Sequence, residues 1–233
     1  MVALFETGYR AIVIGASGGI GAALLARLKA DPRCAIALPL SRSRDGLDIT
    51  EETTVREAAA RLEDQRGSFD LIFNATGALV VDGAGPEKSI RAIDAGHMAK
   101  QFAVNAIGPA LLLKYFAPLL QRDRRSVFAS LSARVGSIGD NRLGGWISYR
   151  AAKAAQNQII RTAAIEIART NRQAIIVALH PGTVDTDLSQ PFSKGRDRFT
   201  PDHSAVRLLE TINGLDESQT GRFFAHDGST IEW

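Results

Sequence analysis

The glycine-rich turn within IVIGASGGIGAALLARL (residues 12–28) constrains the fold more than any other segment. Apolar residues lead directly into the turn and an alanine- and leucine-rich periodic segment follows, which predicts a buried strand, a turn and a helix. Gly15, Gly18, Gly19 and Gly21 permit a sharp bend and the close approach of a pyrophosphate. The helix N-terminus offers unpaired N–H groups and a partial positive charge. A turn without a ligand fits the same letters, but the strand–turn–helix context favours a dinucleotide site.

Strand and helix patterns alternate along the rest of the chain. Strands are expected at residues 11–14, 34–41, 71–74, 126–132, 174–180 and 221–228, and helices at 19–30, 51–64, 98–120, 148–170 and 202–213. Thr50 is expected to cap the second helix, and Thr200 or Asp202 the last one. Alternation indicates parallel strands joined by crossover helices, and nearly continuous apolar runs indicate strands covered on both faces. The prediction is a doubly wound, Rossmann-like α/β fold, with residues 1–233 forming a single NAD(P)-binding domain.

Composition argues against several classes of partner. The net charge is +3, but 28 basic residues are scattered among 25 acidic ones, and the densest basic cluster is RDRR at 122–125, so no nucleic-acid partner is expected. Cys34 is the only cysteine, which fits a reducing compartment. His97, His180, His203 and His226 show no metal-ligand spacing, so no metal is expected. With neither a signal-peptide pattern nor an uninterrupted membrane-spanning apolar run, the sequence predicts a cytoplasmic protein without a membrane partner.

The end of the second strand bears on which dinucleotide binds. An NAD site usually has an acidic residue there to hold the ribose hydroxyls. This strand instead ends in Ser41, Arg42, Ser43 and Arg44, without a carboxylate to repel a 2′-phosphate. Arg42 could pair with that phosphate in a charge-assisted bond. Solvated surface arginines are the alternative, and NADP(H) is favoured over NAD(H).

The segment SYRAAKAA places Tyr149 and Lys153 four residues apart near the start of a helix, and therefore on one helical face. A nearby ammonium and the positive helix N-terminus both favour the phenolate, which makes an otherwise weak acid–base group useful near neutral pH. The pair can then exchange a proton with a substrate oxygen. A bare Y-x-x-x-K is usually only a packed tyrosine and a solvated lysine.

Six segments in order give this pair its context, and with them the whole chain resembles the compact short-chain dehydrogenase/reductases. The segments are GASGGIG (15–21), NATG (74–77), VNAIGP (104–109), SLSARVG (130–136), YRAAK (149–153) and HPGTVDTDL (180–188). Two positions depart from the family pattern. Ile14 replaces a threonine, and Ala75 replaces the second asparagine, which puts one wall of the cofactor site in doubt.

The resemblance implies the site residues. The catalytic set is Ser132, Tyr149, Lys153 and Asn105, with Asn105 anchoring a proton-relay water. The cofactor-binding set is Gly15, Ser17, Gly18, Gly19, Ile20, Gly21, Ser41, Arg42, Asp48, Ile49, Asn74, Ala75, Thr76, Gly77, Tyr149, Lys153, Pro181, Gly182, Val184 and Thr186. Ser130 and Ser137 are competing serines, but the family pattern favours the later of the paired positions, Ser132.

The connection from Ser132 to Tyr149 is longer than usual, and the extra residues around DNRLGG (140–145) are expected near the substrate mouth. With the ending GRFFAHDGSTIEW, this insertion resembles C-factor-like and sniffer-like carbonyl reductases. Residues 189–200 mix glycine, proline and charge and are expected to form a substrate lid. Trp146 is expected either to line the substrate pocket or to cover a subunit interface.

The resemblance implies an NADP(H)-dependent oxidoreductase that interconverts a carbonyl and an alcohol, with a small-molecule substrate. A homodimer or homotetramer is also implied, through the helices at 98–120 and 149–170. The alternative is a non-catalytic dinucleotide-sensing or signalling protein on the same fold, because fold does not dictate function. Such a protein needs the glycine turn but not serine, tyrosine and lysine together. A nucleotide-sugar epimerase is disfavoured, since those chains carry a larger C-terminal substrate domain.

Overall fold

The continuous apolar runs form strands of a parallel sheet, because a strand covered on both faces buries every side chain. The computed structural model describes residues 5–186 and 198–233. Its strands are β1 (Tyr9–Ile14), β2 (Cys34–Leu40), β3 (Leu71–Asn74), β4 (Ser126–Leu131), β5 (Ala174–His180) and β6 (Phe223–Ala225). They form a six-stranded sheet in the order β2-β1-β3-β4-β5-β6, and each neighbouring pair is parallel. This is the predicted α/β fold.

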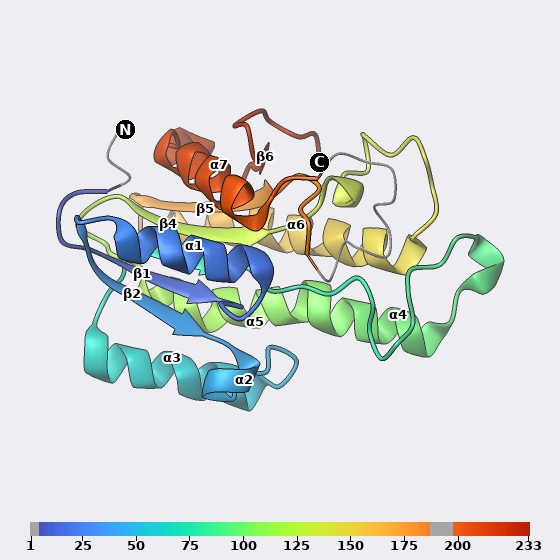
Figure 1. The fold of residues 1–233 in the computed structure, drawn as a ribbon, viewed down its shortest axis with the longest axis horizontal. Helices are drawn as coiled ribbons and strands as arrows, with labels where there is room; N and C mark the ends of the chain where they lie inside the picture. The colour runs from blue at the N-terminus through green and yellow to red at the C-terminus, as the bar shows by residue number, and fades with distance from the viewer. Residues whose placement is uncertain (1–4, 187–197) are drawn as a thin grey trace.

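Helices cover both faces of the sheet and give the molecule three layers (Figure 1). The helices are α1 (Gly19–Ala30), α2 (Arg42–Asp45), α3 (Glu52–Arg66), α4 (Ala95–Phe102), α5 (Gly108–Phe116), α6 (Ile147–Ile167) and α7 (Pro201–Asn213). Alternate residues of β1 serve opposite layers: Ile12 and Ile14 pack with α3, α5 and α6, whereas Ala11 and Val13 pack with α1 and α7. A single strand thus contributes side chains to the core on both faces of the sheet, because successive side chains of a strand point to opposite faces.

Local chemistry sets the helix starts. Thr200 caps α7 as predicted, since its side chain accepts a hydrogen bond from the His203 amide. The prediction that Thr50 caps α3 is wrong: the N-cap is Glu51, and the Thr50 hydroxyl donates to Asp48 Oδ1 at 2.7 Å. The Asp48 carboxylate lies two residues away and accepts this proton, so the hydroxyl is engaged outside the helix.

The helix predicted at 98–120 is not uniform. It begins earlier, as α4, and passes through a π-helical segment, η2 (Ala103–Ile107), before continuing as α5. Ala95–Leu119 is the stretch of the described residues that is long and apolar enough to cross a membrane. In the structure α4 and η2 pack against α6, and α5 contributes Leu112 and Phe116 to the core. Part of this stretch, including Leu112 and Phe116, therefore serves internal packing, whereas Ile107 is 52% exposed.

The strand order positions the site. On one side of β1 lies β2, and on the other lies β3, which follows β2 in the chain, so the direction of winding reverses at β1. In such sheets ligands bind in the crevice outside the carboxyl ends of the strands at this reversal. The turns after β1 and β3 meet there. The Ala75 amide donates to the Ile14 carbonyl, and a Cβ at Gly15 would lie 3.0 Å from the Ala75 carbonyl carbon.

Candidate active site

The turn between β1 and α1 requires glycine at two positions. Gly15 has φ +83°, in the left-handed region that favours glycine. A Cβ at Gly21 would lie 2.2 Å from the Gly15 carbonyl oxygen, which is too close for any residue with a side chain. The N-cap of α1 is Gly18, and neither a side-chain cap nor an acidic residue occupies the first turn. The first amides of α1 are therefore left for an anionic ligand, as the dinucleotide interpretation needs.

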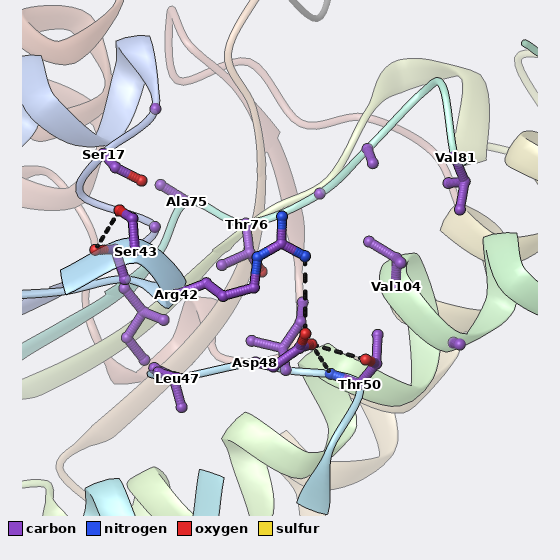
Figure 2. A pocket seen from close by; sticks show the side chains of 18 of the residues that line it. Ser17, Arg42, Ser43, Leu47, Asp48, Thr50, Ala75, Thr76, Val81 and Val104 are labelled. Carbon is purple, nitrogen blue, oxygen red and sulfur yellow. Dashed lines mark hydrogen bonds and ion pairs between the residues drawn. The ribbon is translucent and has the colours of Figure 1, made fainter. Parts of the chain in front are cut away.

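A pocket of about 670 Å³ opens beside this turn (Figure 2). Ten predicted cofactor residues line it: Gly15, Ser17, Gly18, Ser41, Arg42, Asp48, Ile49, Ala75, Thr76 and Gly77. Eleven further lining residues were not predicted from the sequence: Ile14, Ser43, Leu47, Thr50, Ala78, Val80, Val81, Asp82, Lys100, Ala103 and Val104. The lining is polar near β2 and apolar at Ala103 and Val104 of η2, whereas Lys100 of α4 pairs with Asp82, another lining residue, at 2.7 Å.

At the β2 end of the pocket, the Arg42 side chain reaches across to Asp48, to which a dashed line joins it (Figure 2). Its guanidinium lies 3.7 Å from Asp48 Oδ2, and its side chain is 81% exposed, so it is accessible to a phosphate. Ser43 points toward Ser41, with 3.5 Å between the hydroxyl oxygens. The pKa of Asp48 is held below its usual range, first by hydrogen bonds from Thr50 and then by Arg42.

The expectation of a strand end without a carboxylate needs one correction. Residues 42–45 form α2, a short helix that returns Asp45 to the end of β2, where Asp45 Oδ2 accepts the Ser41 amide at 2.9 Å. Asp45 is not among the residues lining the pocket. Its charge is directed to the backbone, and Arg42 and Ser43 remain the groups that α2 presents to the ligand.

Ten predicted cofactor residues do not line this pocket: Gly19, Ile20, Gly21, Asn74, Tyr149, Lys153, Pro181, Gly182, Val184 and Thr186. Several of them nevertheless meet its walls. A Cβ at Gly19 would lie 2.9 Å from Thr186 Cγ2, so the glycine turn and the segment after β5 are in contact. Asn74 Oδ1 accepts hydrogen bonds from the Thr76 amide and hydroxyl at 3.0 and 2.6 Å, which fixes the turn after β3.

The predicted catalytic groups gather on α6 and at the end of β4. Tyr149 and Lys153 are 8% and 2% exposed, and the Lys153 ammonium lies 5.9 Å from the centre of the Tyr149 ring. Ser132 is buried and donates its hydroxyl proton to Asn157 Oδ1 at 2.6 Å. Ser130, the competing serine, accepts hydrogen bonds from Asn74 and Gln156 inside the core. Ser137 accepts from the Asp140 amide at 3.1 Å.

Asn105 lies in η2, and π-helical segments often occur at functional sites. Its Nδ2 donates to the Ala78 carbonyl and to Gln101 Oε1, both at 2.8 Å, while its Oδ1 accepts from the Ala78 amide at 3.1 Å. A Cβ at Gly77 would lie 3.3 Å from both Asn105 Oδ1 and Lys153 Nζ. The asparagine therefore holds the chain after β3 close to the lysine.

Burial dominates the proton affinities of the pair. It raises the pKa of the Tyr149 phenol above its ordinary value and lowers the pKa of Lys153 to about 7. The phenol shift is opposite to the direction expected from its neighbours, because desolvation by burial dominates the pKa of Tyr149 although the Lys153 ammonium lies 5.9 Å from the ring centre. Tyr149 is thus held protonated, as a proton donor requires, and Lys153 titrates near neutrality.

Three polar residues around α6 were not predicted. Gln156 contacts Lys153, Asn157 contacts Ser132, and the buried Glu87 accepts the Ser148 amide at 3.1 Å. Helical spacing could have indicated Gln156, which lies three residues after Lys153 on the same face. Nothing in the local sequence indicates that Glu87 meets a helix that begins sixty residues later.

Trp146 is the N-cap of α6 and has φ +53°. Its ring meets the Tyr149 ring edge-on, with 6.4 Å between the centroids. The tryptophan is therefore part of the surroundings of the tyrosine and helps to enclose it.

Comparison with known proteins agrees with this geometry. A family model described as enoyl-(acyl carrier protein) reductase matches residues 35–230. The 1-hydroxy-2-glutathionyl-2-methyl-3-butene dehydrogenase of Rhodococcus sp. (strain AD45) is 29% identical over 232 residues, covering 95% of this chain and 98% of that protein. C-signal of Myxococcus xanthus is 31% identical over 168 residues, covering 72% and 94%.

Solved structures share the fold. The NADPH-bound carbonyl reductase from chicken fatty liver superposes with a TM-score of 0.83 at 22% identity, covering 98% of this chain and 96% of that one. The carbonyl reductase Sniffer of D. melanogaster gives 0.82 at 22% identity, covering 98% and 100%. Fold and relatives together define an NAD(P)-dependent oxidoreductase. The chain belongs to the short-chain dehydrogenase/reductase family, as the sequence suggested; C-signal is a relative, and Sniffer shares the fold.

Proposed function

We propose that this protein uses NADP(H), in preference to NAD(H), to interconvert a small-molecule carbonyl and alcohol. The observation that carries the proposal is the convergence of Tyr149 and Lys153 on one face of α6, with Lys153 reaching the turn at Gly77 beside the pocket. When bound, the nicotinamide cofactor supplies the hydride chemistry. The uncapped amides of α1 hold the pyrophosphate; ten of the twenty predicted cofactor residues line the pocket, and the others complete the cofactor site around it.

Arg42 supports the preference for NADP(H). It is exposed at the pocket edge, and α2 turns the nearby Asp45 carboxylate to the backbone. Its guanidinium pairs with the 2′-phosphate, and the Ser43 hydroxyl lies on the same wall. The NADPH- and NADP-bound structures with this fold, from chicken fatty liver and Burkholderia multivorans, agree with this choice.

In the reductive direction Tyr149 delivers its proton to the substrate oxygen, and Ser132 donates a hydrogen bond to that oxygen as negative charge develops. Asn157, which accepts from the Ser132 hydroxyl, sets the starting orientation of that hydroxyl. Lys153 holds the nicotinamide ribose, and its ammonium favours the phenolate formed after transfer. Asn105 and Lys153 approach one another at Gly77, where a water can return the proton toward solvent.

Further features belong to the same proposal. Residues 1–233 act as a single NAD(P)-binding domain in the cytoplasm, and copies assemble as a homodimer or homotetramer. The segment 189–200 closes over the substrate as a lid, and its part at 189–197 lies outside the described residues. Phe199 packs against Gly182, one of the predicted cofactor residues: a Cβ at Gly182 would lie 2.8 Å from the phenylalanine ring.

The test is Tyr149→Phe, assayed for NADPH and NADH oxidation across a panel of aldehydes, ketones and quinones. Loss of proton transfer should lower turnover about 10²- to 10⁴-fold while NADPH binding is retained. The matched control is Tyr115→Phe, which removes a surface hydroxyl that donates to Glu52 and should leave turnover unchanged. Turnover by the Tyr149→Phe variant equal to wild type would overturn the catalytic assignment. Binding of NADPH without wild-type turnover of any panel member would favour the sensor.

A further inference from the structure

Gln156 is a buried polar residue that no step of the proposed reaction uses. It lies on α6 three residues after Lys153 and is 0% exposed. A buried amide is costly unless its hydrogen bonds are made, and this one makes them in two directions. Its Oε1 accepts from Lys153 Nζ at 2.8 Å, and its Nε2 donates to Ser130 Oγ at 2.9 Å and to the Leu131 carbonyl at 3.0 Å.

These bonds continue to the cofactor pocket. Ser130 Oγ also accepts from Asn74 Nδ2 at 2.8 Å. Asn74 Oδ1 in turn accepts from the amide and hydroxyl of Thr76, a residue that lines the pocket. One hydrogen-bonded chain therefore runs from the pocket wall through β3 and β4 to the ammonium group on α6, and Gln156 is its last link.

We propose that Gln156 is a positioning residue that holds the Lys153 ammonium beside the turn at residues 74–77. The inference deepens the proposed function and rests on it. Lys153 Nζ also donates to the Leu131 carbonyl at 3.2 Å, the same oxygen that Gln156 Nε2 contacts. Lys153 and Gln156 thus both donate hydrogen bonds to the Leu131 carbonyl, and Gln156 Oε1 accepts a second hydrogen bond from the ammonium. The remaining proton is left for the Gly77 side, where Asn105 lies.

The surroundings make this contact consequential. Burial destabilises the Lys153 ammonium, and a neutral acceptor such as an amide oxygen partly offsets that loss. Tyr149, one turn earlier on α6, is a titratable group beside it, with 5.9 Å between Lys153 Nζ and the ring centre. The turn at Arg134–Gly136 packs against Lys153, but the Arg134 guanidinium pairs with Asp140 at 3.2 Å. Gln156 is accordingly the side-chain oxygen bonded to Lys153 among the described residues.

Two substitutions separate the acceptor role of Gln156 Oε1 from the donor role of Nε2. Gln156→Met keeps the length of the side chain and removes both the acceptor and the donor. Gln156→Glu keeps an acceptor for Lys153, now charged, and loses the donor to Ser130 and Leu131. The Lys153 titration is followed by ¹³C NMR of the lysine side chains, assigned with Lys153→Arg, and NADPH affinity is measured by fluorescence titration.

The titration midpoint of Lys153 should fall by about one pH unit in Gln156→Met, since a hydrogen bond to a charged group is lost, and rise by a similar amount in Gln156→Glu. NADPH affinity should fall several-fold in both variants, because both release Ser130 and the turn beyond it. Opposite titration shifts with a shared loss of affinity are not expected of a defect in packing alone. Gln158→Met, on the exposed side of α6, is the matched control and should change neither quantity.

Midpoints that stay unchanged, or that move in the same direction in both variants, would overturn the inference. If Gln156→Met does not fold, Ser130→Ala breaks the chain one link earlier and should weaken NADPH binding with the Lys153 midpoint kept; an unchanged affinity would also overturn it. The NMR titration does not depend on turnover. A negative result in the Tyr149→Phe test would therefore overturn the proposed reaction but would leave the titration result for Gln156 unchanged, so the two failures can be told apart.

Discussion

Glu87 caps α6 from a distance in the sequence: its carboxylate accepts both the amide and the hydroxyl of Ser148 at the N-terminus of this helix. The N-cap residue of α6 makes no side-chain cap bond of its own, so a loop after β3 supplies what the local sequence lacks. The Glu87 carbonyl also accepts the Trp146 amide. The residue before Tyr149 is thus fixed by a segment that packs beside the pocket.

We expect Glu87→Gln to lower the free energy of unfolding by about 1–2 kcal/mol, because an amide cannot accept both Ser148 donors and the helix N-terminus loses a favourable charge. Urea denaturation measures the change. The comparison is Asp94→Asn, the same chemical change at the N-cap of α4, where Asp94 accepts the His97 amide and where asparagine caps nearly as well. Equal losses in the two variants would contradict a special role for the buried cap.

Arg42→Ala should weaken NADPH binding about tenfold or more and leave NADH binding nearly unchanged, because only NADPH carries the 2′-phosphate. Isothermal titration with both cofactors gives the ratio. Arg44→Ala is the control: Arg44 is also exposed, pairs with Asp45 at 3.7 Å and does not line the pocket. A parallel weakening of NADH, or a similar effect of Arg44→Ala, would show that general charge rather than phosphate recognition is responsible.

Gly21→Ala should prevent cofactor binding and destabilise the fold, since its Cβ would lie 2.2 Å from the Gly15 carbonyl oxygen. In Gly18→Ala the new Cβ would lie 3.5 Å from the same oxygen, an ordinary contact, so its unfolding free energy should stay close to wild type. Thermal denaturation of the two variants tests the contrast. A stable Gly21→Ala protein with NADPH affinity intact would mean that the turn can rearrange.

Acid should destabilise the protein through His180. Burial lowers its pKa to about 4; Arg134 and His226 act in the same direction, and Asp227 opposes them. The unfolded chain therefore takes up this proton first as pH falls, so the contribution is constant above about pH 6.5 and stability is lost between there and pH 4, by up to about 3 kcal/mol. Urea unfolding across this range should show a shallower loss in His180→Asn than in wild type. Identical slopes would refute the assignment.

The pattern of apolar runs was enough to predict the strands and the parallel sheet, because burial on both faces leaves a local trace in residues such as Ile12, Val13 and Ile14. The glycine turn could also be predicted, since the positive φ of Gly15 and the close approach of Gly21 to the Gly15 carbonyl involve residues close in the sequence. The predicted catalytic groups Tyr149 and Lys153 do lie on one face of one helix.

What escaped the sequence was settled by tertiary contacts. The Gln156–Ser130 bond joins positions 26 apart and the Glu87–Ser148 bond positions 61 apart, so neither spacing carries a periodic signal. Thr50 is a residue type that favours the N-cap position, but its hydroxyl donates to Asp48 instead of capping α3. The direction of the Tyr149 pKa shift was missed because the depth of burial is not legible from an i, i+4 spacing.

The π-helical segment at Ala103–Ile107 means that α4 and α5 are continuous in space yet out of phase. A π turn absorbs one residue beyond the α-helical repeat, so the two flanks differ by about 100° in rotation. Excising Ala103 would restore the α-helical repeat and rotate Asn105 away from Ala78, and the pocket would lose one lining methyl group but no polar group. The orientation of the Asn105 amide thus depends on the number of residues between α4 and α5, and one deletion would misdirect it while every polar side chain of the site remains.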